Sequence, residues 1–114
     1  MELYNIFLDD TRCCPEGYTL VRSAEECMEV LSTDRVYKHI SLDHDLGSKS
    51  LNGYAVVEYM IENKIYAERI TVHSANAGGG KRMYESLLRA REQGVFPSHV
   101  KVYLRPMPLF QKQI

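Results

Sequence analysis

The sequence has only three cysteines, lacks tryptophan and carries no large excess of either charge. Cys13 and Cys14 are adjacent and Cys27 stands apart, which fits neither a disulfide framework nor the ligand spacing of a zinc site. We therefore expect reduced thiols in a cytoplasmic protein. The 14 basic residues nearly balance the 15 acidic ones, so the chain lacks the broad positive charge of a dedicated DNA-binding module. This balance argues against sequence-specific DNA binding. It is compatible with a few residues that bind a single phosphate group.

Long apolar segments are also missing. No run approaches the roughly 20 apolar residues that a membrane-spanning helix needs. The start, 1–4, lacks the basic flank and apolar stretch of a signal peptide, so we expect no membrane association. The length of 114 residues fits a single domain over 1–114. A chain of this size buries roughly two-thirds of its unfolded surface, which is enough for a core without staples.

Short apolar runs alternate with amphipathic stretches along the chain. Ser23 and Glu26 have the form of a capping box, which predicts a helix that fades over 32–34. Helical spacing of apolar residues predicts two further helices, over 54–63 and 82–93. The predicted strands are 3–8, 18–22, 40–42, 69–72 and 100–104, and loops are expected over 11–17, 47–53 and 78–80. This alternation is typical of an α/β fold with a mostly parallel sheet of five strands.

The link between the first two predicted strands is short. Residues 9–17 provide nine positions, fewer than the dozen or so that a parallel crossover usually takes. Either the first helix is reduced to a turn, or the second strand is an irregularity at the edge of the sheet.

Acidic residues follow two of the predicted buried strands directly. Asp9 and Asp10 come after the first strand and Asp43 after the third, with Asp45 two positions later. Because the carboxyl ends of parallel strands border one crevice, we expect these carboxylates to meet there. Carboxylate oxygens are the ligands that Mg²⁺ and Mn²⁺ prefer, so the pattern predicts a divalent metal site. In the alternative interpretation, one aspartate of the adjacent pair caps a turn and the other is solvated.

Two histidines stand beside these carboxylates. His44 lies between Asp43 and Asp45, and His73 ends the fourth strand. Imidazoles titrate near neutral pH, so the pair is a candidate for general base and general acid, with Asp43 in the same catalytic group. A single histidine in such a place is more often a hydrogen-bonded structural group or a metal ligand. In a strict strand His44 points away from Asp43 and Asp45, so its role requires that the strand has already ended.

Several polar and basic residues along the same rim are candidates for holding phosphate oxygens. Ser74 and Asn76 supply short hydrogen-bonding side chains, and Lys81 follows a triple glycine ahead of a helix. Arginine matches phosphate oxygens with a planar fork, which makes Arg12 and Arg105 further candidates. In the alternative interpretation the glycines form a flexible loop and the arginines form surface salt bridges.

Taken together, these residues resemble the receiver domain of two-component signalling. That family has an acidic pair after the first strand, a phospho-accepting aspartate after the third, Ser/Thr-Ala after the fourth and Lys-Pro after the fifth. The matching positions here are Asp9-Asp10, Asp43, Ser74-Ala75 and Arg105-Pro106. The resemblance implies a single three-layer domain with receiver/flavodoxin-like strand order 2-1-3-4-5. The short first link implies a reduced first helix.

The departures from that family are themselves informative. An arginine replaces the lysine of the Lys-Pro pair, and His44 and His73 are added. The chain is similar to an offshoot, the cyclic-phosphate processing receiver-like domain, with the pattern Leu-Asp-Asp-x-Arg, Leu-Asp-His-Asp-Leu-Gly and His-Ser-x-Asn. These motifs are Leu8–Arg12, Leu42–Gly47 and His73–Asn76, in the expected order. The resemblance implies the processing of a phosphate ester.

We therefore expect a metal-dependent phosphoesterase that acts on a cyclic phosphate or a related ester, as a small molecule, a cyclic nucleotide or an RNA end. Mg²⁺ or Mn²⁺ is the expected cofactor. Two alternatives stay open. One is a non-enzymatic receiver-type switch that is phosphorylated on Asp43. The other is a module that binds a cyclic nucleotide without cleaving it.

The remaining features are interpreted as structural. The eight tyrosines are scattered, without the spacing of a base-stacking platform. The apolar tail at 107–110 is expected to pack or to serve self-association, so a homodimer is left open.

Overall fold

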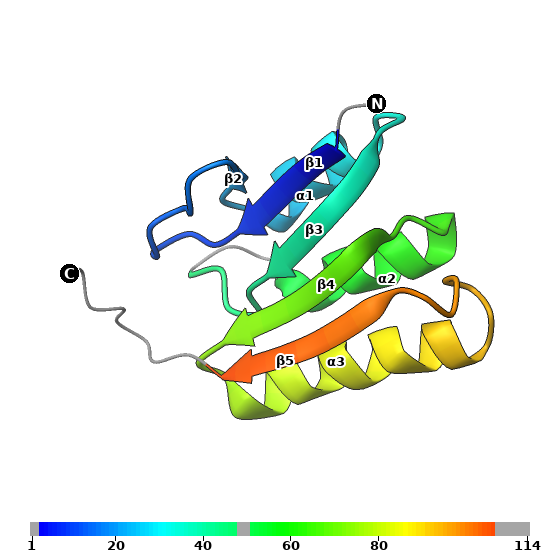
Figure 1. Cartoon of the computed structure of the whole chain (residues 1–114). Coiled ribbons are helices and arrows are strands. Elements are labelled where there is room, and N and C mark those ends of the chain that lie inside the picture. The colour runs from blue at the N-terminus through cyan, green and yellow to red at the C-terminus, as the bar shows by residue number, and fades with distance from the viewer. Residues whose placement is uncertain (1–2, 48–50, 107–114) are drawn as a thin grey trace.

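The five strands form one parallel sheet, as expected. A computed structural model of the chain describes residues 3–47 and 51–106. The sheet order is β2-β1-β3-β4-β5, and every neighbouring pair is parallel (Figure 1). The strands are β1 (Leu3–Leu8), β2 (Thr19–Val21), β3 (Val36–Leu42), β4 (Ala67–Ser74) and β5 (Lys101–Pro106). The receiver-like order is confirmed, whereas the tail prediction at 107–110 and part of the loop 47–53 lie outside the described residues.

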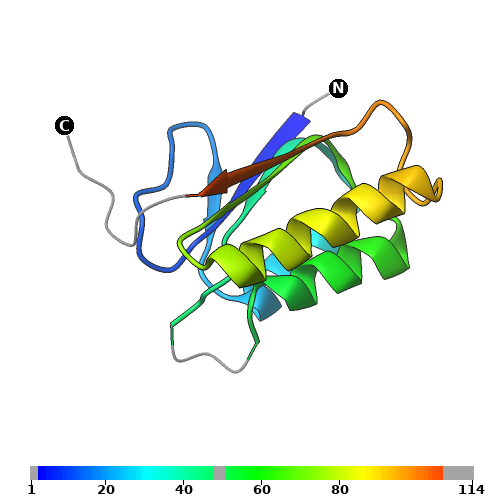
Figure 2. The ribbon, with the colours of Figure 1, turned by 90° about the horizontal axis from the view of Figure 1, so that it is seen from below.

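All three helices of the described residues lie on the same face of this sheet. They are α1 (Ala24–Leu31), α2 (Gly53–Asn63) and α3 (Ala77–Glu92), and Figure 2 shows them side by side beneath the strands. Residues 9–18 connect β1 to parallel β2 without a helix, which confirms the reduced first helix. A helix at that crossover would pack on the opposite face. The described part of the chain therefore has two layers where we expected three.

The start of α1 follows the predicted capping pattern. The Ser23 hydroxyl accepts a hydrogen bond from the Glu26 backbone N–H at 3.1 Å. The Glu26 carboxylate accepts from the backbone N–H of Arg22 at 2.8 Å, one residue ahead of the cap. The first bond satisfies an N–H group in the first turn, which has no acceptor within the helix, and the second satisfies the N–H group of the residue before the cap.

The start of α3 differs from the prediction. We expected the triple glycine to be a loop, but the helix begins at Ala77, capped by the Asn76 side chain, which accepts from the Gly79 N–H at 2.8 Å. A Cβ atom on Gly79 would lie 2.5 Å from the His44 ring. Close packing against His44 therefore requires glycine in this turn, and that contact outweighs the low helix propensity of glycine.

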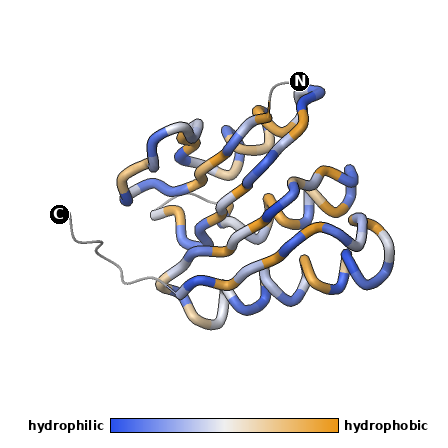
Figure 3. Tube along the Cα trace, viewed as in Figure 1, coloured by the Kyte–Doolittle hydropathy of each residue, from blue (hydrophilic) through white to orange (hydrophobic). Residues whose placement is uncertain are grey.

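The core lies between the sheet and the helices. Alternate strand residues such as Ile6, Leu8, Ile40 and Val72 point into it and are fully buried. Polar and apolar residues alternate along β5 (Figure 3). Val102, between Lys101 and Tyr103, belongs to the buried core. Among the helices of the described residues, none is both long and apolar enough to cross a membrane.

Candidate functional site

Three carboxylates meet at the carboxyl ends of β1 and β3. Ligand oxygens of Asp9, Asp10 and Asp43 lie within 4.8 Å of one another. Their positions follow from the sheet, because the Asp9 N–H donates to the Val21 carbonyl and the Asp43 N–H donates to the Leu8 carbonyl, each at 3.0 Å. The predicted convergence of Asp9, Asp10 and Asp43 is therefore present.

Asp9 is fully buried, and hydrogen bonds hold both of its oxygens. Its Oδ1 accepts from the backbone N–H groups of Thr11 and Arg12, each at 2.9 Å. Its Oδ2 accepts from Arg12 Nη1 at 3.0 Å and from His73 Nε2 at 2.9 Å. Burial alone raises the pKa of Asp9, but the bonds from His73, Arg12 and Thr11 outweigh it and hold that pKa well below its usual range. Asp9 is thus an ionised group that also caps the turn after β1, as the alternative interpretation proposed for one aspartate.

Asp43 has the opposite electrostatic character. Its residue is 3% exposed, and its Oδ2 accepts from Arg12 Nη1 at 3.3 Å. Burial and the nearby negative charge of Asp9 raise the pKa of Asp43 to about 6, against the smaller lowering effects of His73 and Arg12. The carboxyl group of Asp43 therefore changes charge close to neutral pH.

Arg12 lies between Asp9 and Asp43, at the centre of the acidic cluster. Its side chain is 3% exposed, and the same Nη1 atom forms both ion pairs. We predicted Arg12 as a phosphate ligand at the rim. The structure places it deeper, where its charge offsets that of the two carboxylates.

Asp10 lies under the loop that follows β3. Gly47 has a φ of +64°, and a Cβ atom there would lie 2.6 Å from Asp10 Oδ2. Both the backbone conformation and the lack of space require glycine at this position. The close approach of the Gly47 backbone brings the Asp10 carboxylate and the loop after Asp43 together.

The cluster could hold a divalent cation. The hydrogen bonds that each carboxylate already accepts affect which of them could contact the cation directly. Three carboxylates at this spacing fit the oxygen coordination of Mg²⁺ or Mn²⁺. The oxygens of Asp9 already accept hydrogen bonds from Thr11, Arg12 and His73. Asp9 therefore has little capacity left for direct contact with a cation, and its main contribution would be negative charge.

His73 is buried beside the cluster and is held from three sides. Its Nε2 bonds Asp9, its Nδ1 bonds Ser41 Oγ at 2.7 Å, and its ring stacks on Phe7 with a centroid distance of 4.6 Å. Because ionised Asp9 can only accept, Nε2 carries a proton. The sequence analysis missed Ser41 and Phe7, although each lies two residues before an aspartate of the cluster and thus on the same face of its strand.

His44 belongs to a different group of residues. Its Nδ1 lies 2.7 Å from Asp45 Oδ1, which also accepts from Asn76 Nδ2 at 3.1 Å. The His44 ring packs against Gly79 in α3, so it lies on the helix-covered face. The bond to His44 lowers the pKa of Asp45. Among the described residues, His44 and His73 therefore share no hydrogen-bond partner.

Asp45 and the remaining phosphate candidates are divided between the two faces. Asp45 is outside the cluster of three carboxylates, and its side chain is 59% exposed. Ser74, Asn76 and Lys81 line one cavity of about 420 Å³ at the start of α3. Arg105 lines another, of about 450 Å³, on the other face of the sheet. The structure thus brings together Ser74, Asn76 and Lys81, and it separates them from Arg105.

The parallel order, the reduced first crossover and the acidic cluster at the strand ends define a receiver-like domain. The family model of the cyclic-phosphate processing receiver domain matches residues 4–89, so this chain belongs to that family. Membership supports a role in cyclic-phosphate processing and bears out the resemblance seen in the three sequence motifs.

Two further comparisons concern whole proteins and solved structures. No curated protein matches the chain. One similar solved structure is described as the yeast Spc42 trimeric coiled-coil, amino acids 181–211, fused to another structure. It has a TM-score of 0.55 and 15% sequence identity over 95% of this chain and 73% of that one, so the likeness concerns the fold alone.

Proposed function

We propose that this domain is a phosphoesterase that opens a cyclic phosphate by hydrolysis, on a nucleotide or at an RNA end. The observation that carries the proposal is the contact of Arg12 Nη1 with both Asp9 Oδ2 and Asp43 Oδ2 at the carboxyl edge of the sheet. It holds a fixed positive charge between two carboxylates at the edge of the sheet where a phosphate group would bind. Membership of a family named for cyclic-phosphate processing gives the substrate class.

In the proposed reaction, water attacks phosphorus and His44, oriented by Asp45, takes its proton. A new P–O bond forms, one ring P–O bond breaks, and the leaving alkoxide takes a proton from solvent. The product is a phosphate monoester. Arg12 offsets the negative charge that develops on the phosphoryl oxygens, as a preorganised cation does in a buried site. Ser74, Asn76, Lys81 and Arg105 remain proposed contacts to the substrate.

A divalent cation bound by Asp10 and Asp43 would polarise the phosphoryl group. Asp9 would add negative charge to that site while it holds Arg12 in place. We therefore propose Mg²⁺ or Mn²⁺ as the cofactor. Asp45 is proposed to act near the cation only indirectly, because its carboxylate bonds His44 and Asn76 rather than joining the cluster.

The two histidines have different proposed roles. His73 is proposed as a positioning residue, since Asp9 and Ser41 engage both ring nitrogens. His44, oriented by Asp45, is the better candidate for a direct proton transfer. Replacing His73 with Gln should then lower kcat/KM without changing the shape of its pH dependence, because the proton-transfer group is still present. A pH profile that loses one limb in His73→Gln would instead make His73 the acid or base.

Turnover of a 2′,3′-cyclic nucleotide and of an RNA with a cyclic-phosphate end, with and without Mg²⁺ or Mn²⁺, tests the proposal. Asp43→Asn is the loss-of-function variant, and its circular dichroism spectrum controls for folding. Metal-dependent opening by the native protein, lost in Asp43→Asn, is the expected result. No opening of either substrate, together with a stable acyl-phosphate on Asp43 after incubation with a small phosphodonor, would replace the enzyme with a receiver-type switch.

A further inference from the structure

The face of the sheet opposite the helices is polar and aromatic, and no helix of the described residues covers it (Figure 2). We call this surface the open face. Its strand positions alternate with those that enter the core. Phe7, Ser41, Thr71 and His73 on this face are buried. Its accessible side chains include His39, Arg69, Lys101, Tyr103 and Arg105. Such a composition is unlike that of a sheet face prepared for a second layer of helices.

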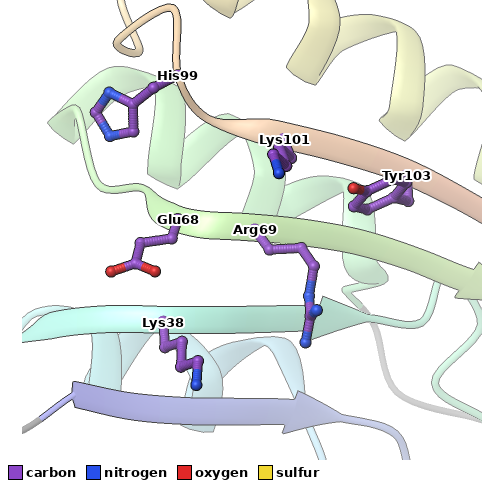
Figure 4. A pocket seen from close by; sticks show the side chains of 6 residues that line it. All are labelled: Lys38, Glu68, Arg69, His99, Lys101 and Tyr103. Carbon is purple, nitrogen blue, oxygen red and sulfur yellow. The ribbon is translucent and has the colours of Figure 1, made fainter.

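Positive charge is concentrated on the open face. Two adjoining cavities of about 370 and 450 Å³ lie there and share Arg69 and Tyr103 in their linings. Figure 4 shows side chains of the first cavity projecting from the strands, with the helices behind the sheet. The cations that line the two cavities are Lys38, Arg69, Lys101 and Arg105. The carboxylate in these linings belongs to Glu68, so the surface is basic although the chain carries a net charge of −1.

These cations are available for an anionic ligand. Within residues 3–47 and 51–106, none of the lining lysines and arginines forms an ion pair with a carboxylate. Lys101 and Arg105 lie on the same strand, four positions apart, which corresponds to roughly 13 Å along β5. An extended polyanion can contact both, whereas a single phosphate can contact only one.

Exposed aromatic rings stand among these charges. Tyr103 is 44% exposed and lies between Lys101 and Arg105 on β5. Tyr18 is half-buried and packs edge-on against Phe7 across the face. A basic groove with aromatic rings is how proteins bind single-stranded nucleic acid without sequence preference, because every base has a face that stacks.

A hydrogen-bond network fixes two of these side chains. The Tyr18 hydroxyl and Arg69 Nη2 both bond His39 Nδ1, the latter at 3.2 Å. Since Arg69 can only donate, Nδ1 accepts, and His39 Nε2 donates to Thr71 Oγ1 at 2.8 Å. Burial and the charge of Arg69 lower the pKa of His39 to about 4, so the ring stays neutral at pH 7. The network orders the aromatic and the cationic groups before any ligand arrives, which lowers the entropic cost of binding.

The open face borders the candidate site at His73, whose side chain is buried. His73, which bonds Asp9, lies on this face, and it pairs in register with Arg105 of β5. We propose that the open face binds a single strand of RNA and directs its terminal cyclic phosphate to the cluster of Asp9, Asp10 and Asp43. The identity of the strand as RNA rests on the proposed function, because a 2′,3′-cyclic phosphate requires the ribose 2′-hydroxyl.

Fluorescence anisotropy with a labelled single-stranded RNA of about eight nucleotides, ending in a cyclic phosphate, measures this binding directly. Tyr103→Ala should weaken binding by about tenfold, as the loss of one stacked base does. Arg69→Gln and Lys101→Gln should each weaken binding and lower the salt dependence of log K by about 0.7. Tyr66→Ala matches Tyr103 in exposure and Arg82→Gln removes an exposed cation from α3, and both should bind like the native chain.

Equal affinity of the native chain and the open-face variants would overturn the proposal. A native chain that binds no RNA but sediments as a dimer would also overturn it, if Tyr103→Ala converts the dimer to a monomer. The open face would then bind a second copy of the chain. The readout needs no turnover. RNA binding that is lost in the variants, in a protein that opens no cyclic phosphate, would support the open face while removing the phosphoesterase. Opening of a cyclic mononucleotide by a protein that binds no RNA would support the phosphoesterase and overturn the proposal for the open face.

Discussion

His73 Nε2 lies 2.9 Å from Asp9 Oδ2 and joins the carboxyl end of β4 to that of β1, across the intervening β3. The two residues are 64 positions apart in the sequence. The bond fixes a proton on Nε2 and contributes to the low pKa of Asp9. His73 thus holds the same Asp9 oxygen that Arg12 bonds.

The first prediction concerns this buried pair. His73→Ala removes the bonds to Asp9 and Ser41 together with the ring that stacks on Phe7. We expect the free energy of unfolding to fall by roughly 2–4 kcal/mol, as for other losses of a buried hydrogen-bonded group. Urea unfolding followed by circular dichroism measures it. His99→Ala, at an exposed position, is the matched control and should change stability by less than about 0.5 kcal/mol. A loss in His73→Ala no larger than in the control would contradict the structural role.

The second prediction concerns the pH dependence of stability. Folding raises the pKa of Asp43 from 3.8 to about 6, so the folded state favours its protonated form. The stabilisation is complete below pH 3.8 and is lost as the pH rises through about 6. Asp43→Asn should therefore be more stable than the native chain at pH 8 in EDTA, by on the order of 3 kcal/mol at most.

Urea unfolding of both proteins at pH 5 and pH 8 measures this difference, and the comparison cancels the contributions of other titrating groups. One of these is His39, whose lowered pKa acts in the opposite direction, because its stabilisation is lost as the pH falls from 6.5 toward about 4. A difference between Asp43→Asn and the native chain that does not change between the two pH values would show that Asp43 titrates normally.

The third prediction compares two neighbouring glycines of α3. A Cβ atom on Gly78 has nothing closer than 3.9 Å, whereas one on Gly79 would lie 2.5 Å from the buried His44 ring. Gly78→Ala should stabilise the chain by up to about 1 kcal/mol through helix propensity. Gly79→Ala should destabilise it by roughly 1–3 kcal/mol, because the ring of His44 must move. Thermal unfolding of both variants tests this, and equal effects of the two substitutions would contradict the packing of His44 on α3.

The fourth prediction concerns the metal. Saturating Mg²⁺ or Mn²⁺ should raise the melting temperature of the native chain, because a ligand that binds only the folded state stabilises it. Asp10→Asn and Asp43→Asn should abolish this increase, since both carboxylates belong to the cluster that would hold the cation. Asp45→Asn should retain it, because Asp45 lies outside the cluster. Loss of the metal response in Asp45→Asn alone would move the cation site to the His44 side.

The sequence predicted the site correctly for those residues whose position is set by the end of a strand. Asp9, Asp10 and Asp43 had to converge once their strands were parallel neighbours, and the three motifs led to the correct family. Side-chain direction was harder to predict, because it depends on where each strand stops and what packs above it. His44 therefore points to α3 while His73 points to the open face, and Arg12 lies inside the cluster rather than at the rim.

The open face could not be predicted from composition. A net charge near zero hides the local excess of cations, because acidic residues elsewhere balance it. Tyr18 and Tyr103 are far apart in the sequence, and they share one surface because of the sheet order and because no helix within residues 3–47 and 51–106 covers that face. The helix across the triple glycine was missed for a similar reason, since the contact that favours it comes from His44.

The account rests most directly on whether the domain opens a cyclic phosphate. Phosphorus NMR of a 2′,3′-cyclic nucleotide, incubated with the native chain and Mg²⁺ or Mn²⁺, shows the ring phosphate and the monoester as separate signals. We predict that the cyclic signal is replaced by a monoester signal with the native chain and persists with Asp43→Asn. Persistence of the cyclic signal with both proteins, and with a cyclic-phosphate-ended RNA in the same assay, would contradict the phosphoesterase function.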